Sequence, residues 1–430
     1  MPLQSDHLKT ALEEPRSSTA RTDVSWLLIA LVVIAAVKFV LRGPERAVWN
    51  SGDFMPIYLA ARAWMHGLDP CAQLSPAGLR ALYPPPTFVV VAPLALMPWP
   101  FAKAVWCVLN LAALALLIGF LHRLAEIRFF GPRSLCLIAG TLALEPSSTA
   151  IMLGQPCIIV ASLVAYSILA AERGSQSLSG VTKGLGLALK PQLAAAFALP
   201  HLIGRRWKIC IAIGLTVLVL GGIALLQLHS QPGWFANYLS NLNSAFGPGG
   251  GDDPGPTNPN RVQLINLRYP LTVLLGNGLL AAYVPLLTGA LLAIPPLLAL
   301  IQRPTGLRLI HCVSLLALVE LIFIYHRSYD AILVVFPMAW ALSAAVPRNL
   351  AWPVLLTVAM FFLPSGVGVQ ALGEQDWFPI WISSGLLWRG LFIPYQAWAL
   401  VVMACWMLYC LVSQTALPRT TISRNGGIQS

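Results

Sequence analysis

Asp53 is the carboxylate best placed for chemistry, because it stands in the segment Ser51-Gly52-Asp53-Phe54 shortly after the first long apolar stretch. The chain contains only 16 Asp and Glu residues in 430, so each can be weighed separately. Partial loss of water at a lipid boundary raises the pKa of a carboxylate toward a value that suits a general base acting on a hydroxyl. Asp also caps helix N-termini well, and the pattern alone favours neither interpretation.

Lys190, in Leu189-Lys190-Pro191-Gln192, interrupts an apolar segment and has no carboxylate near it in the sequence. Burying an ionisable group in a membrane costs roughly 3 kcal/mol unless a partner is present. A phosphate would be a natural partner for this ammonium group, and the proline that follows favours a broken helix. The alternative is a side chain that snorkels to the membrane surface.

A second polar cluster, Tyr325-His326-Arg327-Ser328-Tyr329-Asp330, stands at the boundary of another apolar block, with His326 and Asp330 one helical turn apart. Arg and His beside Tyr suit the binding of a phosphate and of sugar hydroxyl groups. The alternative is an interfacial belt, in which the same residue types are common. Glu320, in the preceding apolar block, is a candidate for the buried partner of Arg327.

Amide and phenol groups supply further candidates for binding a substrate, each of them weak evidence by itself. These candidates are Tyr58, Tyr83, Gln155, Asn260, Gln263 and Asn266. The eight cysteines show no disulfide or metal-ligand spacing, and the sequence has no HExxH, phosphate-binding glycine loop or serine-hydrolase elbow. The chemistry therefore narrows to carboxylates, amides, His and Lys, with no metal site and no cofactor expected.

The elements that must position these residues are membrane-spanning helices. Hydrophobic residues make up 57% of the chain and charged residues 10%, whereas an ordinary globular protein has about a quarter charged residues. The apolar blocks approach the roughly 20 residues that cross a hydrocarbon core, which predicts an all-α integral membrane protein with about 12 spans. The blocks are 26–41, 87–98, 101–121, 134–150, 156–171, 184–203, 209–228, 279–300, 309–325, 331–346, 350–363 and 390–412.

Basic residues in short loops stay on the cytoplasmic side of a membrane. With the amino terminus inside, counting the spans places these residues inside: Arg205, Arg206, Lys208, Arg303, Arg308, Arg348, Arg419 and Arg424. The same count places Arg123, Arg128 and Arg133 outside, so the side of the loop 122–133 stays open, and a re-entrant segment within 83–121 is an alternative. The net charge of +11 is spread over such loops, which indicates contact with lipid headgroups rather than nucleic acid.

Two loops, 42–83 and 229–277, are too long to be simple connectors and are expected to carry function outside the cytoplasm. The first has apolar and aromatic residues at helical spacing from Phe54 to Trp64, which suits a helix along the membrane surface. It ends in a turn at 67–70, and the prolines after Tyr83 predict an extended return to the membrane. The second is rich in Gly, Pro and Asn, which predicts a flexible cover.

Taken in order, these landmarks resemble those of the family 87 glycosyltransferases, which use polyprenyl phosphate-linked mannose. The landmarks are 51–54, Tyr58, Ala60, Ala61, Gly67, Pro70, 83–86, Pro93, Leu94, Trp106, Asn110, Gly154, Gln155, Lys190, Pro191, 205–207 and 325–330. The second loop departs from the usual Asn-Gln-Ser run, because Asn260-Arg261-Val262-Gln263 stands there. The acceptor or the sugar is therefore expected to differ.

The resemblance implies a GT-C fold, with surface helices in a long first extracytoplasmic loop. Asp53 falls on the family's catalytic carboxylate, which implies that it is the general base. Lys190, His326 and Arg327 are the cations available for the donor phosphate. The residues expected to bind the substrates are Tyr58, Tyr83, Gln155, Asn260, Gln263, Tyr329 and Asp330.

The expected function is transfer of a sugar, mannose by resemblance, from a polyprenyl phosphate to a lipid or glycan acceptor outside the cytoplasm, with inversion. The alternative is a transporter or a flippase for lipid-linked sugars, although no internal repeat is visible. The expected organisation in the cell inner membrane is a cytoplasmic tail at 1–25, a catalytic region at 26–345, further spans at 346–413 and a second cytoplasmic tail at 414–430.

Overall fold

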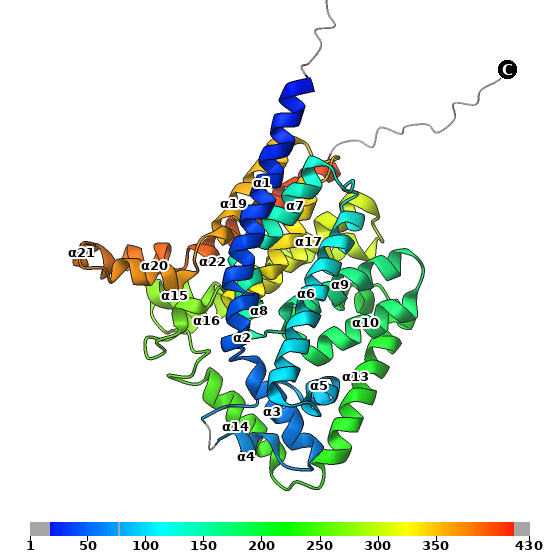
Figure 1. Cartoon of the computed structure of the whole chain (residues 1–430), viewed down its shortest axis with the longest axis vertical. Helices are drawn as coiled ribbons and strands as arrows, with labels where there is room; N and C mark the ends of the chain where they lie inside the picture. The colour runs from blue at the N-terminus through cyan, green and yellow to red at the C-terminus, as the bar shows by residue number, and fades with distance from the viewer. Residues whose placement is uncertain (1–17, 76–77, 417–430) are drawn as a thin grey trace, which may run out of the picture.

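The computed structural model describes residues 18–75 and 78–416, and within these ranges every regular element is a helix (Figure 1). Residues 1–17 and 417–430 of the two expected tails lie outside the described residues, as do Arg419 and Arg424. The all-α architecture expected of this membrane protein is therefore confirmed.

The helices fall into three groups along the chain. The first group is α1 (Ser18–Arg42), α2 (Pro44–Trp49), α3 (Phe54–Met65), α4 (Pro70–Leu74), α5 (Pro85–Ala95), α6 (Trp99–Leu124), α7 (Pro132–Ala143), α8 (Glu145–Leu153), α9 (Cys157–Glu172), α10 (Gln176–Leu189), α11 (Pro191–Ala194), α12 (Leu199–Ile203) and α13 (Trp207–Leu228). The second loop contains α14 (Trp234–Phe246), the 3-10 helix η2 (Arg261–Gln263) and α15 (Arg268–Leu275). The last group is α16 (Leu279–Ile301), α17 (Gly306–Phe323), η3 (Ser328–Val334), α18 (Val335–Leu342), α19 (Arg348–Ala359), η4 (Met360–Phe362), α20 (Gly366–Gly373), α21 (Ile380–Ser383), η5 (Trp388–Phe392) and α22 (Tyr395–Ala416).

Fewer described helices can cross a membrane than the twelve blocks suggested. Six are long and apolar enough, or eight if two bent pairs, α7 with α8 (49°) and α19–η4 with α20 (62°), each count as one span. Three of the expected spans are shorter helices: α5, α9 and the stretch Ser328–Leu342. α5 has 11 residues and is therefore about 16 Å long, which is too short to cross a core about 30 Å thick.

The block 184–203, expected to be a single span, is a hairpin whose tip is Lys190. α10 ends at Leu189, and the chain then returns through α11 and α12. The two arms lie side by side, because the Nζ atom of Lys183 is 2.5 Å from Nε2 of His201. Lys-Pro breaks the helix here, since the ring of Pro191 lacks an N–H and fits only the first turn of the next helix.

The loop 122–133 lies at the same end of the molecule as the basic cluster 205–208, contrary to the span count. Glu126 lies against Gly306, whose backbone N–H also donates to the Glu172 carboxylate. Glu172 in turn lines one cavity together with Arg205 and Arg303. Because α5 does not cross the membrane, α6 starts at the same end of the molecule as Asp53. The number of spans before the loop 122–133 is therefore one fewer than the sequence count, which moves this loop to the other side.

The apolar face of α3 packs on protein rather than on lipid. Phe54, Ile57, Tyr58 and Trp64 are all buried, in a cluster shared with α5 and the start of α6. The periodicity correctly predicted the helix and its apolar face. That α3 lies along the membrane surface stays a prediction.

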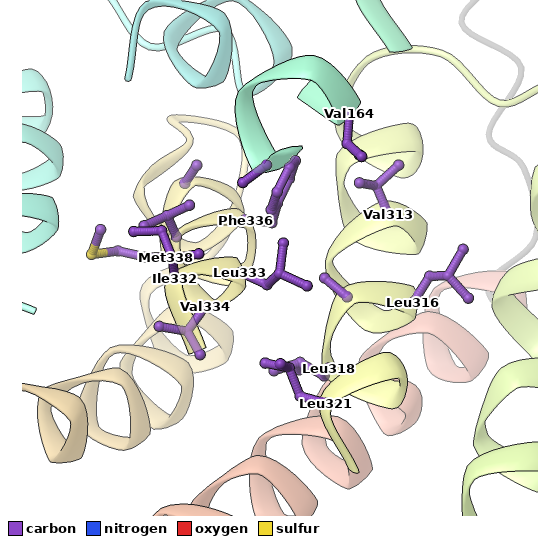
Figure 2. Packing of buried hydrophobic residues seen from close by; sticks show 14 of the residues in the cluster. Val164, Val313, Leu316, Leu318, Leu321, Ile332, Leu333, Val334, Phe336 and Met338 are labelled. Atoms are coloured by element: carbon purple, nitrogen blue, oxygen red, sulfur yellow. The ribbon is translucent and has the colours of Figure 1, made fainter. Parts of the chain in front are cut away.

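A buried core between α9, α17, η3 and α18 holds the two ends of the molecule together. Side chains including Val164, Val313, Leu321, Leu333 and Phe336 belong to one cluster, part of which Figure 2 shows. Every residue of α17 from Leu309 to Ile322 is buried. α17 is thus a buried central helix, with one cavity near each of its ends.

Candidate functional site

Backbone hydrogen bonds hold the turn that contains Asp53, and the Asp53 side chain does not cap α3. The amide groups of Ser51 and Asp53 donate to the carbonyl oxygens of Met152 and Leu153, at 3.0 Å in both cases, which docks this turn on the end of α8. Asp53 precedes α3, but its side chain makes no capping hydrogen bond. The carboxylate instead accepts a hydrogen bond from the amide of Gln155, with 2.6 Å between Nε2 and Oδ2.

Gly154 allows the Asp53 turn and Gln155 to approach each other. It ends α8 with φ +71°, a left-handed conformation that favours glycine, and an added Cβ atom would lie 2.7 Å from Cβ of Phe54. Its carbonyl accepts from the indole N–H of Trp106 at 2.7 Å. The ring of Trp106 stacks on Phe54, with centroids 4.7 Å apart. Phe54, Trp106 and Gly154, which are far apart in the sequence, thus pack against one another beside the Asp53 turn.

We expect Gly154→Ala to cost about 2 kcal/mol or more, because left-handed strain adds to the contact with Phe54. Displacement of the neighbouring Gln155 should also weaken its bond to Asp53. Gly174→Ala is a matched control, since Gly174 also has a positive φ (+80°) but open space around its Cβ position. Thermal melting of both variants checks the expectation, and equal losses would mean that the approach of Phe54 carries no cost.

Gln155 links Asp53 to the cationic part of the site. Its Oε1 atom accepts from the hydroxyl of Tyr83 at 2.9 Å and from the ammonium of Lys190 at 3.3 Å. Because Lys can only donate, the oxygen must face Lys190 and the amide N–H groups must face Asp53. Burial, together with the nearby Asp53 carboxylate, raises the pKa of Tyr83 well above its ordinary value, so Tyr83 remains a donor.

Lys190 is buried and paired, so the snorkelling interpretation is wrong. Its side chain is 3% exposed, and its Nζ atom lies 2.5 Å from Oδ1 of Asp330, which is 1% exposed. Nδ1 of His326 lies 3.2 Å from the other oxygen of Asp330. The ring of Tyr329 lies 4.7 Å from Nζ of Lys190 and adds a cation–π contact. A carboxylate distant in sequence thus holds the position expected for a phosphate.

Arg327 pairs with Asp252 in the second loop, not with Glu320. Its NH2 atom is 2.9 Å from Oδ1 of Asp252, and its Nε atom donates to the hydroxyl of Tyr325 at 2.7 Å. Both oxygens of Glu320 are buried without a partner among the described residues. Burial by itself lowers the pKa of Arg327, but the surrounding oxygens of Tyr325, Tyr329 and Asp252 raise it by more. The net effect is a raised pKa, so the guanidinium stays charged.

Part of the second loop folds around the carboxylate of Asp253, a local structure that its composition did not predict. The Asp253 carboxylate accepts from the backbone N–H groups of Gly249 and Gly255, both at 2.9 Å. The amide of Asn258 closes the turn on the carbonyls of Gly251 and Asp253. Farther along, the N–H of Ile265 donates to the carbonyl of His326, so the loop is tied to the 325–330 run.

These side chains surround a cavity of about 370 Å³. Of the predicted site residues, it is lined by Asp53, Tyr83, Gln155, Lys190, Arg327 and Tyr329. Asp330 and His326 are buried behind Lys190, and Gln263 reaches the site only through its oxygen, 3.3 Å from NH1 of Arg327. Tyr58 is buried away from the cavity, where its hydroxyl donates to the carbonyl of Met97. Asn260 is exposed and bonds Gln263.

Four polar lining residues were not predicted from the sequence: Arg80, Gln192, Tyr238 and Asp252. Asp252 was identifiable in principle, because carboxylates are few and this one stands in a long loop. Gln192 lies two residues after Lys190, at the tip of the hairpin. Arg80 and Tyr238 carried no distinguishing signal, since single polar residues in loops are common.

These features define the class of the protein. It is an α-helical, membrane-spanning protein whose cavity, at one end of the helices, is lined by a carboxylate and by paired cations. The chain belongs to glycosyltransferase family 87, whose model matches residues 81–323, more than half of the chain. The matched range contains Gln155 and Lys190, whereas Asp53 and the run 325–330 lie outside it.

The chain is also similar to two proteins of Mycobacterium tuberculosis, from strains CDC 1551 / Oshkosh and ATCC 25618 / H37Rv, each named alpha-(1->3)-arabinofuranosyltransferase. Each is 27% identical over 184 residues, which covers 42% of this chain and 42% of the relative. The similarity therefore spans less than half of the length of these relatives.

Proposed function

We propose that the protein transfers a sugar from a polyprenyl phosphate to a hydroxyl of a lipid or glycan acceptor, with Asp53 as general base. The observation that carries this proposal is that the Asp53 carboxylate lines the cavity and is held by Gln155, instead of capping α3. Family membership supports the reaction type. The helices on every side suit a donor whose prenyl chain stays in the membrane.

In the proposed reaction Asp53 removes the proton of the acceptor hydroxyl, and the oxygen attacks the anomeric carbon. The bond from that carbon to the phosphate oxygen breaks, and the phosphate leaves with the electron pair on the opposite face, which inverts the configuration. A polyprenyl phosphate is already a good leaving group, so one base suffices. The amide of Gln155 fixes the orientation of the carboxylate.

Lys190 and Arg327 are the proposed contacts of the departing phosphate, because both are cations that line the same cavity as Asp53. Each is already held by a carboxylate, Asp330 or Asp252. That arrangement fixes the position of the cations before the donor binds and leaves donor N–H groups available. His326, behind Asp330, is proposed to orient this carboxylate rather than to touch the phosphate.

Two donor sugars are candidates. Mannose follows from the sequence resemblance, and arabinofuranose follows from the names of the relatives. Purified protein in nanodiscs would be given polyprenyl phosphate mannose or polyprenyl phosphate arabinofuranose with a glycan acceptor. Transfer from either one supports the proposed function, and the better donor identifies the sugar. Binding without transfer, together with movement of the lipid across vesicles, would favour the flippase alternative.

We further propose a GT-C arrangement in the inner membrane, with the catalytic region at 26–345 and additional helices at 346–413. In this arrangement the end of the molecule that contains Asp53 faces away from the cytoplasm. There α2, α3 and α4 lie along the extracytoplasmic surface of the membrane.

Labelling with an impermeant maleimide tests this orientation. Both Gln73 and Arg128 are exposed, at opposite ends of the molecule. Gln73→Cys should react in intact cells, and Arg128→Cys only after permeabilisation, with the parent protein as a control for its own eight cysteines. The reverse pattern would overturn the orientation.

A further inference from the structure

A second cavity, of about 560 Å³, lies at the opposite end of the molecule from Asp53. α17 connects the two cavities, since Thr305 and Leu309 line this one, whereas Ile324 and Tyr325 line the other. The 18 residues of α17 correspond to about 27 Å, close to the thickness of a hydrocarbon core. The two cavities therefore open toward opposite faces of the membrane.

The wall of this cavity is strongly basic. Its charged lining residues are Lys183, Arg205, Arg206, Lys208, Arg303 and Glu172. In the part of the chain that the structure describes, none of the five cations forms an ion pair. Glu172 is the one carboxylate among the lining residues that are described, and it is engaged by the N–H of Gly306. The cavity therefore has one carboxylate, Glu172, against five basic side chains, and its positive charge is largely uncompensated.

Lys183 is the most telling of these cations, because its side chain is 0% exposed. Its Nζ atom lies 2.5 Å from Nε2 of His201. Burial and the nearby Arg206 lower the pKa of Lys183 to about 7. When Nζ is protonated it can only donate, so Nε2 accepts and the ring proton sits on Nδ1. That atom is buried and has no acceptor among the described residues. A buried cation and an orphaned donor thus lie side by side, and an anion would satisfy both.

The arginines at the mouth show the same lack of partners. Burial and the guanidinium of Arg303 lower the pKa of Arg206, so these two positive groups face each other without compensation. The backbone is also strained there, since Arg205 and Arg303 have φ of 52° and 58°, in the left-handed region. Exposed arginines on a cytoplasmic face need only set topology, but this explanation does not account for a fully buried lysine.

We propose that this cavity binds the phosphate group of an anionic membrane lipid. The phosphate would lie between Lys183 and the guanidinium groups of Arg206 and Arg303. The hydrocarbon chain would follow the apolar part of the wall, where Phe197, Val313 and Leu316 lie. Anionic phospholipids and polyprenyl monophosphates share this chemistry. The proposal does not depend on the sugar-transfer reaction, because it concerns the opposite end of the molecule.

Thermal melting of the delipidated protein in neutral detergent tests the proposal. Dioleoyl phosphatidylglycerol and a polyprenyl monophosphate are added separately, with dioleoyl phosphatidylcholine and inorganic phosphate as comparisons. We expect a saturable rise in melting temperature with the anionic lipids, and the tighter of the two identifies the source. A rise as large with inorganic phosphate or with phosphatidylcholine would overturn the requirement for an anionic lipid.

Variants locate the site. Arg303→Gln and Lys183→Met should weaken lipid binding about tenfold to a hundredfold, the range expected for a lost charged hydrogen bond. Arg128→Gln, at the same end but outside the cavity, should bind as the parent does. Lys183→Met should melt no lower than the parent without lipid, because it removes a buried amine whose charged form is disfavoured there, as its lowered pKa indicates. Unchanged lipid affinity in both cavity variants, or an equal loss in Arg128→Gln, would refute the site.

Discussion

Asp53→Asn should abolish sugar transfer while leaving the protein folded, because the change removes basicity and keeps nearly the same shape. A lost general base lowers the rate by about a hundredfold to ten-thousandfold. Asn can still accept the hydrogen bond from Gln155, so the turn docked on α8 should persist. The measurement is turnover of a polyprenyl phosphate sugar, with melting and donor binding measured on the same sample.

The outcome separates a base from a structural residue. Asp53 makes no capping hydrogen bond to α3, so loss of a helix cap, which costs about 1 kcal/mol, is not expected. Gln155→Leu is a useful second variant. It removes the hydrogen bond that orients the Asp53 carboxylate but keeps the carboxylate itself, so it should slow transfer less than Asp53→Asn does. If Asp53→Asn turned over at the parental rate, the proposed mechanism would have no base.

Lys190→Met is expected to destabilise the protein by about 3–5 kcal/mol, because it leaves the Asp330 carboxylate buried without its cation. Adding Asp330→Asn should restore most of the loss, since the double variant buries no unpaired charge and Asn can still bond His326. Lys103→Met serves as a control, because the ammonium of Lys103 contacts the carbonyl of Val48 and the ring of Trp99 but has no ion pair among the described residues. Melting temperatures of the parent, Lys190→Met, Asp330→Asn and the double variant measure the coupling between Lys190 and Asp330.

The double variant also tests the proposed contact with the donor phosphate, free of the stability effect. Its affinity for a polyprenyl phosphate sugar should fall, because a donor to the phosphate has been lost. Parental affinity in a well-folded double variant would leave Lys190 with a purely structural pairing. A melting curve of Lys190→Met equal to that of the parent would instead contradict the ion pair.

Several features followed from the sequence because they depend on local pattern. The apolar blocks are helices, since their length and composition allow little else in a membrane. The buried face of α3 followed from helical periodicity, and the break at Lys190-Pro191 followed from the missing N–H of proline. The pairing of His326 with Asp330 also agrees with their separation of four residues.

Partners remote in sequence were beyond such reasoning. Lys190 and Asp330 are 140 residues apart, and Arg327 and Asp252 are 75 apart, so no periodicity relates them. The nearer carboxylate, Glu320, was the wrong choice for Arg327, because both of its oxygens are buried without a hydrogen-bond partner among the described residues. The turn around Asp253 in the second loop was also not predicted, because composition does not reveal that one carboxylate accepts two backbone N–H groups.

The sequence by itself determined that this is an α-helical membrane protein, which residues carry its rare charges, and which family landmarks they match. Only the tertiary structure decided which apolar blocks cross the membrane, since α5 is too short and the 184–203 block folds back on itself. It also decided that Asp53 meets Gln155 while the cations meet carboxylates. The physical reason is that hydrophobicity and helix propensity act along the chain, whereas the pairing of buried charges depends on how the helices pack.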